Sequence, residues 1–116
     1  MSSIKIKIQL VLNDSIAIGP GKADLLEAIQ QKGSISAAAL IMGMSYKRAW
    51  DLVNTMNKCF KQAVVATSVG GGKGGGAQVT DFGLQVLVQY RVIEAKTTLA
   101  VEAEMSDFLL MLVTSE

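Results

Sequence analysis

The stretch with the most obvious chemical potential is "SVGGGKGGG", residues 68–76, in which six glycines surround one lysine. Three of these glycines fit the spacing G-x-G-x-x-G, which in dinucleotide-binding proteins brings a phosphate to the first turn of the following helix. Here the following residues, 77–80, are typical of a strand instead. The P-loop pattern fails as well, because Lys73 is followed by Gly74 and not by serine or threonine. The loop therefore does not predict a nucleotide site.

Few other residues offer catalytic or metal-binding chemistry. The chain has no histidine, which is the commonest general base and the commonest ligand of transition metals, and Cys59 is its single cysteine. The carboxylates, lysines and tyrosines do not cluster along the sequence. We therefore expect no catalytic residue, no metal site and no enzymatic activity. A lone cysteine also allows no disulfide within the chain.

The distribution of charge indicates a different chemistry. The net charge is only +1, but one segment is basic and the next is acidic. Between Ala28 and Thr80 the charged residues are Lys32, Lys47, Arg48, Lys58, Lys61 and Lys73, with Asp51 as the single acid. From Asp81 onward the acids Asp81, Glu94, Glu102, Glu104, Asp107 and Glu116 outnumber Arg91 and Lys96. The two segments should have different partners, and the basic one suits a polyanion.

A predicted helix over residues 45–60 carries much of this basic charge. Its apolar side has Ala49, Val53, Met56 and Phe60 at helical spacing, with Trp50 beside them, so we expect Trp50 in the core. Its other side has Lys47, Asp51, Asn54 and Lys58, flanked by Arg48 and Thr55. A charged face is often merely solvated, but the amide of Asn54 can read a base edge. Asp51 would repel phosphate unless it orients Lys47 or Arg48, or accepts a hydrogen bond from a cytosine amine.

These residues need elements that hold them in place, and the sequence patterns predict an order for those elements. Alternation in "IKIKIQLVL" predicts a strand over residues 4–12, followed by a short return strand at "IAI". Helices are expected over 22–32 (stopped by Gly33), over 36–42 (capped by Ser36) and over 45–60 (capped by Ser45). Gly43 supplies a tight turn between the last two helices, which makes them a helix-turn-helix candidate.

A hairpin and a long helix complete the predicted order. Two β-rich runs around the glycine loop predict a hairpin over 64–80, and Thr80 is expected to cap a helix over 81–104. Because the loop lies inside one hairpin, we interpret it as the tip of a wing and not as a domain linker. Lys73 at this tip could reach a phosphate or the minor groove. The predicted fold class is α+β, mainly α: a winged helix-turn-helix with an N-terminal strand pair, in one domain over 1–116.

The last part of the chain has more apolar surface than a domain of this size can cover. The helix over 81–104 has a broad apolar stripe, and the tail "DFLLMLV" is too short to span a bilayer. We expect the tail to bury against a helix of the same chain or of a partner, and residues 81–113 to form a homodimer. No apolar run reaches the ~18 residues of a membrane span and no signal peptide is evident, which predicts a cytoplasmic protein without membrane contact.

The combination of motifs resembles a known family. "GSISAAALIMGMSYKRAWDLVNTMN" followed by "GGGKGGGAQVTDFG" is similar to the amino-terminal DNA-binding domain of the molybdate-responsive transcriptional regulators of ModE type. The resemblance covers about Leu10 to Ala103, and a more distant one links the chain to the winged helix of LysR-type regulators. It implies a homodimer whose long helix pairs with its mate and whose recognition helix enters the major groove. It also implies that the recognition motif falls on Ser45, Tyr46, Lys47, Arg48 and Trp50, and the wing on Lys73.

The resemblance implies a DNA-binding function. We expect a homodimeric, sequence-specific regulator of molybdenum transport or utilisation genes that binds double-stranded DNA. Its expected DNA contacts are Ser45, Tyr46, Lys47, Arg48, Asn54, Thr55, Lys58, Lys61 and Lys73. Family members bind molybdate in further domains; because this sequence stops at Glu116, we expect no separate oxyanion-binding domain and no cofactor. The alternative is a winged-helix interaction module that binds a protein or a small oxyanion and uses no DNA.

Overall fold

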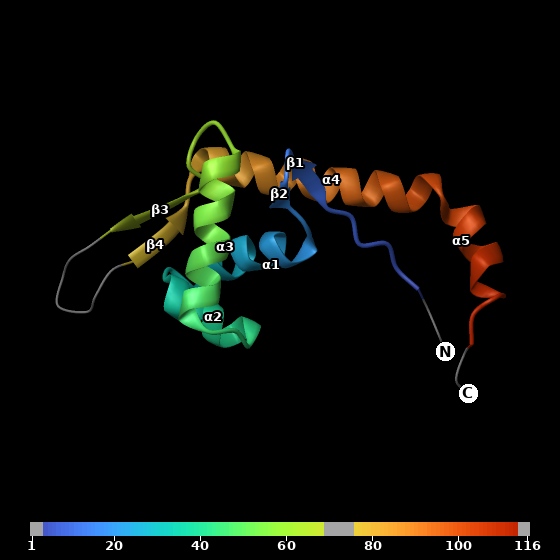
Figure 1. Ribbon diagram of the computed structural model, residues 1–116, viewed down its shortest axis with the longest axis horizontal. Coiled ribbons are helices and arrows are strands. Elements are labelled where there is room, and N and C mark those ends of the chain that lie inside the picture. Colours follow the sequence, from blue (N-terminus) through green and yellow to red (C-terminus); the bar gives the residue numbers. More distant parts are fainter. Residues whose placement is uncertain (1–3, 69–75, 114–116) are drawn as a thin grey trace.

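Five helices and two pairs of strands make up the part of the chain that the computed structural model describes, residues 4–68 and 76–113 (Figure 1). In chain order they are β1 (Leu10–Leu12), β2 (Ser15–Ile18), α1 (Pro20–Lys32), α2 (Ile35–Met42), α3 (Tyr46–Cys59), β3 (Val65–Ser68), β4 (Gly76–Val79), α4 (Asp81–Ala100) and α5 (Glu102–Leu109). Both strand pairs are antiparallel. This order confirms the predicted mainly helical α+β fold, with the β3–β4 hairpin in the place of a wing.

Two helices start at other residues than predicted. The first helix begins at Pro20 and not at residue 22, because proline fits the first helical position, where a missing N–H costs nothing. The second helix begins at Ile35, and its cap is Ser34, not Ser36: Ser34 Oγ accepts the N–H of Ala37 at 3.1 Å. This side chain satisfies an N–H that otherwise has no partner within the helix.

The helix-turn-helix is confirmed at its turn. Gly43 has φ of 70°, a left-handed conformation that favours glycine, and the N–H of Met44 donates back to Ala39 O at 3.0 Å. The next helix starts at once, because Ser45 Oγ accepts the N–H of Arg48 at 3.1 Å. These two contacts fix the direction in which α3 leaves α2.

The predicted strand over 4–12 is only partly correct. Pairing is confined to Leu10–Leu12, because the return strand β2 has only four residues to offer. The alternation nevertheless sorts the side chains as expected: Ile4, Ile6 and Ile8 are half-buried, and Lys5 and Lys7 are exposed. This segment lies beside α4, where the hydroxyl of Tyr90 donates to Ile8 O at 2.7 Å.

The core gathers around α1 and excludes the one tryptophan. Its largest fully buried side chains are Tyr90, Ile18, Leu25, Leu26, Ile29, Met56, Val53 and Val64. The prediction that Trp50 belongs to the core is wrong, since 39% of this residue is exposed. Ala49, Val53 and Met56 already occupy the inward stripe of α3, and Trp50 lies one position around the helix from it. An aromatic side chain is therefore left at the surface, on the helix that carries the basic residues.

The long helix is also shorter than predicted. It ends at Ala100 instead of residue 104, because Val101 has φ of −115° and ψ of 17°, outside the helical range. The chain then forms α5, which turns away at the end of α4 (Figure 1). The predicted cap is confirmed, since Thr80 Oγ1 accepts the N–H of Gly83 at 2.9 Å.

The base of the hairpin meets the start of α4 at a very close approach. Val64 O accepts the N–H of Thr80 at 3.0 Å, and the hydroxyl of Thr80 donates to Ala63 O at 2.7 Å. Gly83 lies directly above this junction, where a Cβ atom would overlap Val64 O and crowd Val79. Gly83 has a helical backbone that any residue can adopt, so glycine is required there only because a Cβ atom has no space.

Replacing Gly83 with alanine should lower the free energy of unfolding by about 1–3 kcal/mol, because the added methyl must push the hairpin base away from α4. Chemical denaturation followed by circular dichroism measures this change. The matched control is Gly21→Ala in α1, where a Cβ has nothing within 4 Å. Equal stability of the two variants would contradict the close approach.

Candidate nucleic-acid interface

The outer face of α3 presents the side chains that sequence analysis assigned to DNA. Ala49, Val53 and Met56 anchor the inner side of the helix in the core. The residues left exposed on the helix and at its start are Ser45, Tyr46, Lys47, Arg48, Asp51, Asn54 and Lys58. Thr55 is half-buried, and Lys61 is exposed just beyond the end of the helix. The structure therefore leaves most of the predicted residues from 45 to 61 exposed, whereas Lys73 lies outside the described residues.

Two of these residues have a structural role in the helix itself. Ser45 caps α3, so its hydroxyl oxygen is engaged by the N–H of Arg48. The hydroxyl of Thr55 donates to Asp51 O at 2.9 Å, one turn back along the helix. Both oxygens keep a lone pair for a further donor, and the hydroxyl of Ser45 can still donate.

The acid on this face pairs with a lysine. Lys47 Nζ lies 3.2 Å from Asp51 Oδ2, with 84% and 63% of the two side chains exposed. Asp51 thus pairs with Lys47, one of the two cations that sequence analysis gave as its partners. An exposed pair of this kind contributes only ~0–1 kcal/mol, so a phosphate can displace the carboxylate at little cost.

The hairpin is held against the recognition unit by an amide that sequence analysis did not single out. Asn57 Oδ1 accepts the N–H groups of Val64 at 2.8 Å and Val65 at 3.2 Å, and its Nδ2 donates to Val65 O at 3.1 Å. These bonds fasten β3 to the last turn of α3. The other strand is fastened too, because the N–H of Ala77 donates to Gly33 O at 2.9 Å.

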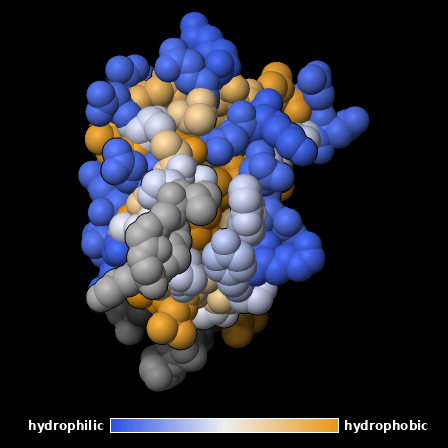
Figure 2. Space-filling view, turned by 90° about the vertical axis from the view of Figure 1, so that its left-hand side faces the viewer, coloured by the Kyte–Doolittle hydropathy of each residue, from blue (hydrophilic) through white to orange (hydrophobic). Residues whose placement is uncertain are grey.

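These bonds place the hairpin and the helix-turn-helix in one half of the molecule. Figure 1 shows α2, α3 and the hairpin together at one end, and α5 at the opposite end of α4. Figure 2 looks onto the end from which the hairpin projects, and hydrophilic residues border the hairpin on both sides. Helix and hairpin can therefore meet the same large ligand while α5 faces away.

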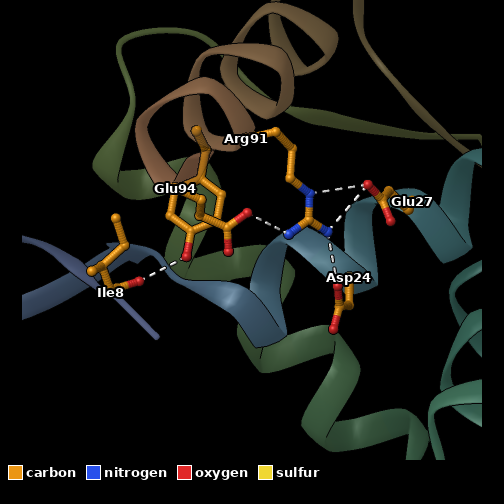
Figure 3. A network of polar contacts seen from close by, with 6 residues as sticks. Ile8, Asp24, Glu27, Arg91 and Glu94 are labelled. Carbon is orange, nitrogen blue, oxygen red and sulfur yellow. Dashed lines mark hydrogen bonds and ion pairs between the residues drawn. The ribbon is translucent and has the colours of Figure 1, made fainter. Parts of the chain in front are cut away.

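A network of ions fixes α4 to α1 (Figure 3). Arg91 contacts Asp24 at 2.8 Å, Glu27 at 3.1 Å and Glu94 at 2.9 Å. Burial alone would lower the pKa of the Arg91 guanidinium, but hydrogen bonds to Glu94 and Asp24 outweigh it and raise the pKa above its ordinary value. Three acids surround this one cation, so Arg91 adds no positive surface for DNA.

Two other polar side chains of the core are structural. Burial raises the pKa of Tyr90 to about 12, and the negative charge of Glu94 acts in the same direction, so the phenol stays protonated and can donate to Ile8. Lys22 is buried and donates to Ile16 O, and burial lowers the pKa of its ammonium group.

In residues 4–68 and 76–113, no three His, Cys, Asp or Glu side chains group in a way that could hold a metal ion. No helix within those ranges is both long enough and apolar enough to cross a membrane.

Comparison with known proteins gives this surface its context. No protein-family model matches the chain. The chain is 42% identical over 78 residues to the molybdenum transport protein ModE of Azotobacter vinelandii. The aligned residues make up 67% of this chain and 29% of that protein. The chain is 36% identical over 89 residues to the DNA-binding transcriptional dual regulator ModE of Escherichia coli K12, covering 77% and 34% of the two proteins. The chain belongs to the ModE-type family of transcriptional regulators.

Family membership applies to a part of these proteins only, because the chain spans about a third of the length of the relatives it matches. A further relative, at 41% identity over 83 residues, is the molybdenum-pterin-binding protein MopA of Rhodobacter capsulatus, with 72% of this chain and 31% of that protein covered. Its name describes binding of a molybdenum compound by that protein. The expectation of no cofactor for the present chain therefore stays a prediction.

Asn57→Ala should destabilise the protein by about 1–3 kcal/mol, because the buried N–H of Val64 loses its acceptor. Urea denaturation measures the loss. Asn54→Ala is the matched control, an exposed position one turn earlier that should change stability by less than about 0.5 kcal/mol. If both variants unfolded at the same urea concentration, Asn57 would not be the clamp between α3 and the hairpin.

Proposed function

We propose that this protein is a homodimeric, sequence-specific DNA-binding regulator and that α3 enters the major groove. The observation that carries the proposal is the outer face of α3, where exposed cations and an exposed amide follow a short helix and a left-handed glycine turn. That order of elements is the one in which a second helix reads base edges. The transcriptional regulators among the relatives support the same function.

The residues divide into two kinds of contact. Lys47, Arg48 and Asn54 lie on the first turns and the middle of α3, where side chains reach base edges; arginine pairs well with guanine and asparagine with adenine. Tyr46 and Thr55 flank them on the same helix. Lys58, Lys61 and Lys73 would contact phosphates, which fix the position of the protein without reading sequence.

The target genes are proposed from the relatives. Names that refer to molybdenum transport and molybdenum-pterin binding support a role in the control of molybdenum transport or utilisation. A regulator of this kind acts in the cytoplasm and needs no enzymatic activity.

The proposed dimer rests on an unpartnered stripe of α4. Val88, Val92, Ala95 and Leu99 follow at intervals of four, three and four residues, which places them on one face of the helix. All four are exposed, with Leu99 at 70%. If the same stripe of a second copy packs against it in antiparallel orientation about an axis between Val92 and Ala95, Val88 meets Leu99 and the stripe is buried in a self-complementary way.

The DNA interface can be tested with Lys58→Ala. The sites bound by the wild-type protein are first selected from a random DNA pool, and affinity is then measured at several salt concentrations. Removing one phosphate contact should weaken binding to all sequences alike and lower the salt slope by about one unit.

Two controls accompany this measurement. Lys5→Ala removes an exposed lysine of the segment beside α4 and should leave the slope unchanged. Asn54→Ala should alter base preference with little change in slope. An unaltered slope in the Lys58 variant would remove that residue from the interface. If the wild-type protein bound no DNA even at low salt, the alternative of an interaction module without DNA would replace the proposal.

Leu99→Lys tests the dimer. Lysine would place a charge in the proposed interface, where Leu99 would otherwise bury an apolar side chain. The free energy of dimerisation should become less favourable by about 2 kcal/mol or more, which raises the dimer dissociation constant about thirtyfold. Analytical ultracentrifugation measures this constant, and circular dichroism checks that the fold persists. Gln30→Lys, which adds the same charge to an exposed position of α1, should leave the constant unchanged. Identical dissociation constants for both variants would exclude the stripe as the dimer surface.

A further inference from the structure

An open apolar groove runs along the first half of α4. It has a volume of about 640 Å³. It is lined by Leu10, Ile18, Phe60, Phe82, Leu84, Gln85, Val86, Val88, Gln89, Tyr90 and Ile93. Its only polar side-chain groups are two amides and the hydroxyl of Tyr90, so no ionised side chain lines it. An open surface of this kind favours an apolar, uncharged occupant.

The chain contains a segment of matching character. Residues 108–113 ("FLLMLV") carry no charge, and all of them except the half-buried Leu109 are exposed. Leu110 is 86% exposed, Met111 is 78% exposed and Val113 is fully exposed. Sequence analysis left open whether this tail buries in its own chain or in a partner.

The tail does not lie in the groove of its own chain. A helix of the length of α4 spans about 30 Å, and the groove follows its first half, from Phe82 to Ile93. The tail follows α5 at the other end of α4 (Figure 1). To reach the groove, α5 and the tail would have to turn back along α4 at Val101, and the structure instead directs α5 away from α4.

A second copy can supply the tail. In the antiparallel arrangement of α4 proposed above, the first half of each α4 lies beside the end of the other, where α5 and the tail begin. Val88 belongs both to the stripe and to the wall of the groove, so the two surfaces are continuous. We propose that residues 108–113 of a second copy of this chain dock in the groove, so that the two chains of the dimer exchange their tails. This proposal rests on the dimer of the proposed function.

Charge at the groove is complementary to the segment that leads into the tail. Glu102, Glu104 and Asp107 precede the tail on α5, and all are exposed. The α3 end of the groove has Lys61 directly after the lining residue Phe60. In the dimer free of DNA, attraction between these groups favours the tail over another apolar segment.

Cross-linking between two chains tests the docking. With Cys59 replaced by serine, one chain carries Gln85→Cys in the groove and a second, of different size through a tag, carries Leu110→Cys in the tail. Both positions are exposed, so the fold should tolerate the changes. A short bis-maleimide should join the two chains, and Gln30→Cys paired with the same tail variant should give no product.

The outcomes separate the tail from the dimer itself. A dimer in ultracentrifugation without the Gln85–Leu110 product would overturn the docking but leave the proposed dimer standing. A monomer would overturn both. A concentration-independent link within one chain that carries both cysteines would place the tail in its own groove and overturn the exchange. As a second measurement, the double variant Leu110→Ser and Met111→Ser should weaken the dimer at least about tenfold with an unchanged circular dichroism spectrum.

Discussion

One buried peptide segment holds the recognition helix, the hairpin and the long helix in a fixed relation. The N–H of Val64 donates to Asn57 of α3, and its carbonyl accepts from Thr80 at the start of α4. Gly83 packs against the same carbonyl with no room for a side chain. Val64 is completely buried, so a polar group left without its partner there would cost ~1–3 kcal/mol. The direction of α4 relative to α3 is therefore set by a few bonds of defined geometry.

In the proposed function, this constraint connects dimerisation to DNA recognition. Two α4 helices that pair about a two-fold axis place two α3 helices at a fixed separation, and that separation must match two half-sites on the DNA. The network of Arg91 with Asp24, Glu27 and Glu94 adds a second fixation, between α4 and α1. Flexibility at either contact would make the distance between the two α3 helices variable, because a small change in the angle between α4 and the rest of the chain is amplified along the length of α4. In the proposed regulator, rigidity at these contacts is thus part of how the DNA sequence is read.

Sequence reasoning succeeded where a single residue type decides a local geometry, and failed where packing decides. The caps Ser45 and Thr80 and the left-handed turn at Gly43 follow from side-chain length and backbone freedom, and the basic face of α3 follows from helical periodicity. Trp50 was assigned to the core because it lies beside the apolar stripe of the helix, but Ala49, Val53 and Met56 already occupy the inward positions. In the sequence, Asn57 could not be told apart from other polar residues of a helix, because its hydrogen-bond partners Val64 and Val65 lie beyond the following loop. The end of α4 at Val101 could not be predicted, because no glycine or proline marks it in the sequence.

The distribution of charge sorts the two ends of the molecule by partner. Positive side chains gather on α3, near the hairpin, whereas α5 carries Glu102, Glu104 and Asp107 in front of the apolar tail. These acids repel the phosphate backbone, and the repulsion acts over about a Debye length, ~10 Å at moderate salt. An apolar tail without such neighbours would bind nonspecifically to any exposed apolar surface, including that of a protein already on DNA. In the proposed dimer these acids disfavour contact of the tail with DNA, and electrostatic repulsion then leaves the apolar groove of α4 as the favoured site of the tail.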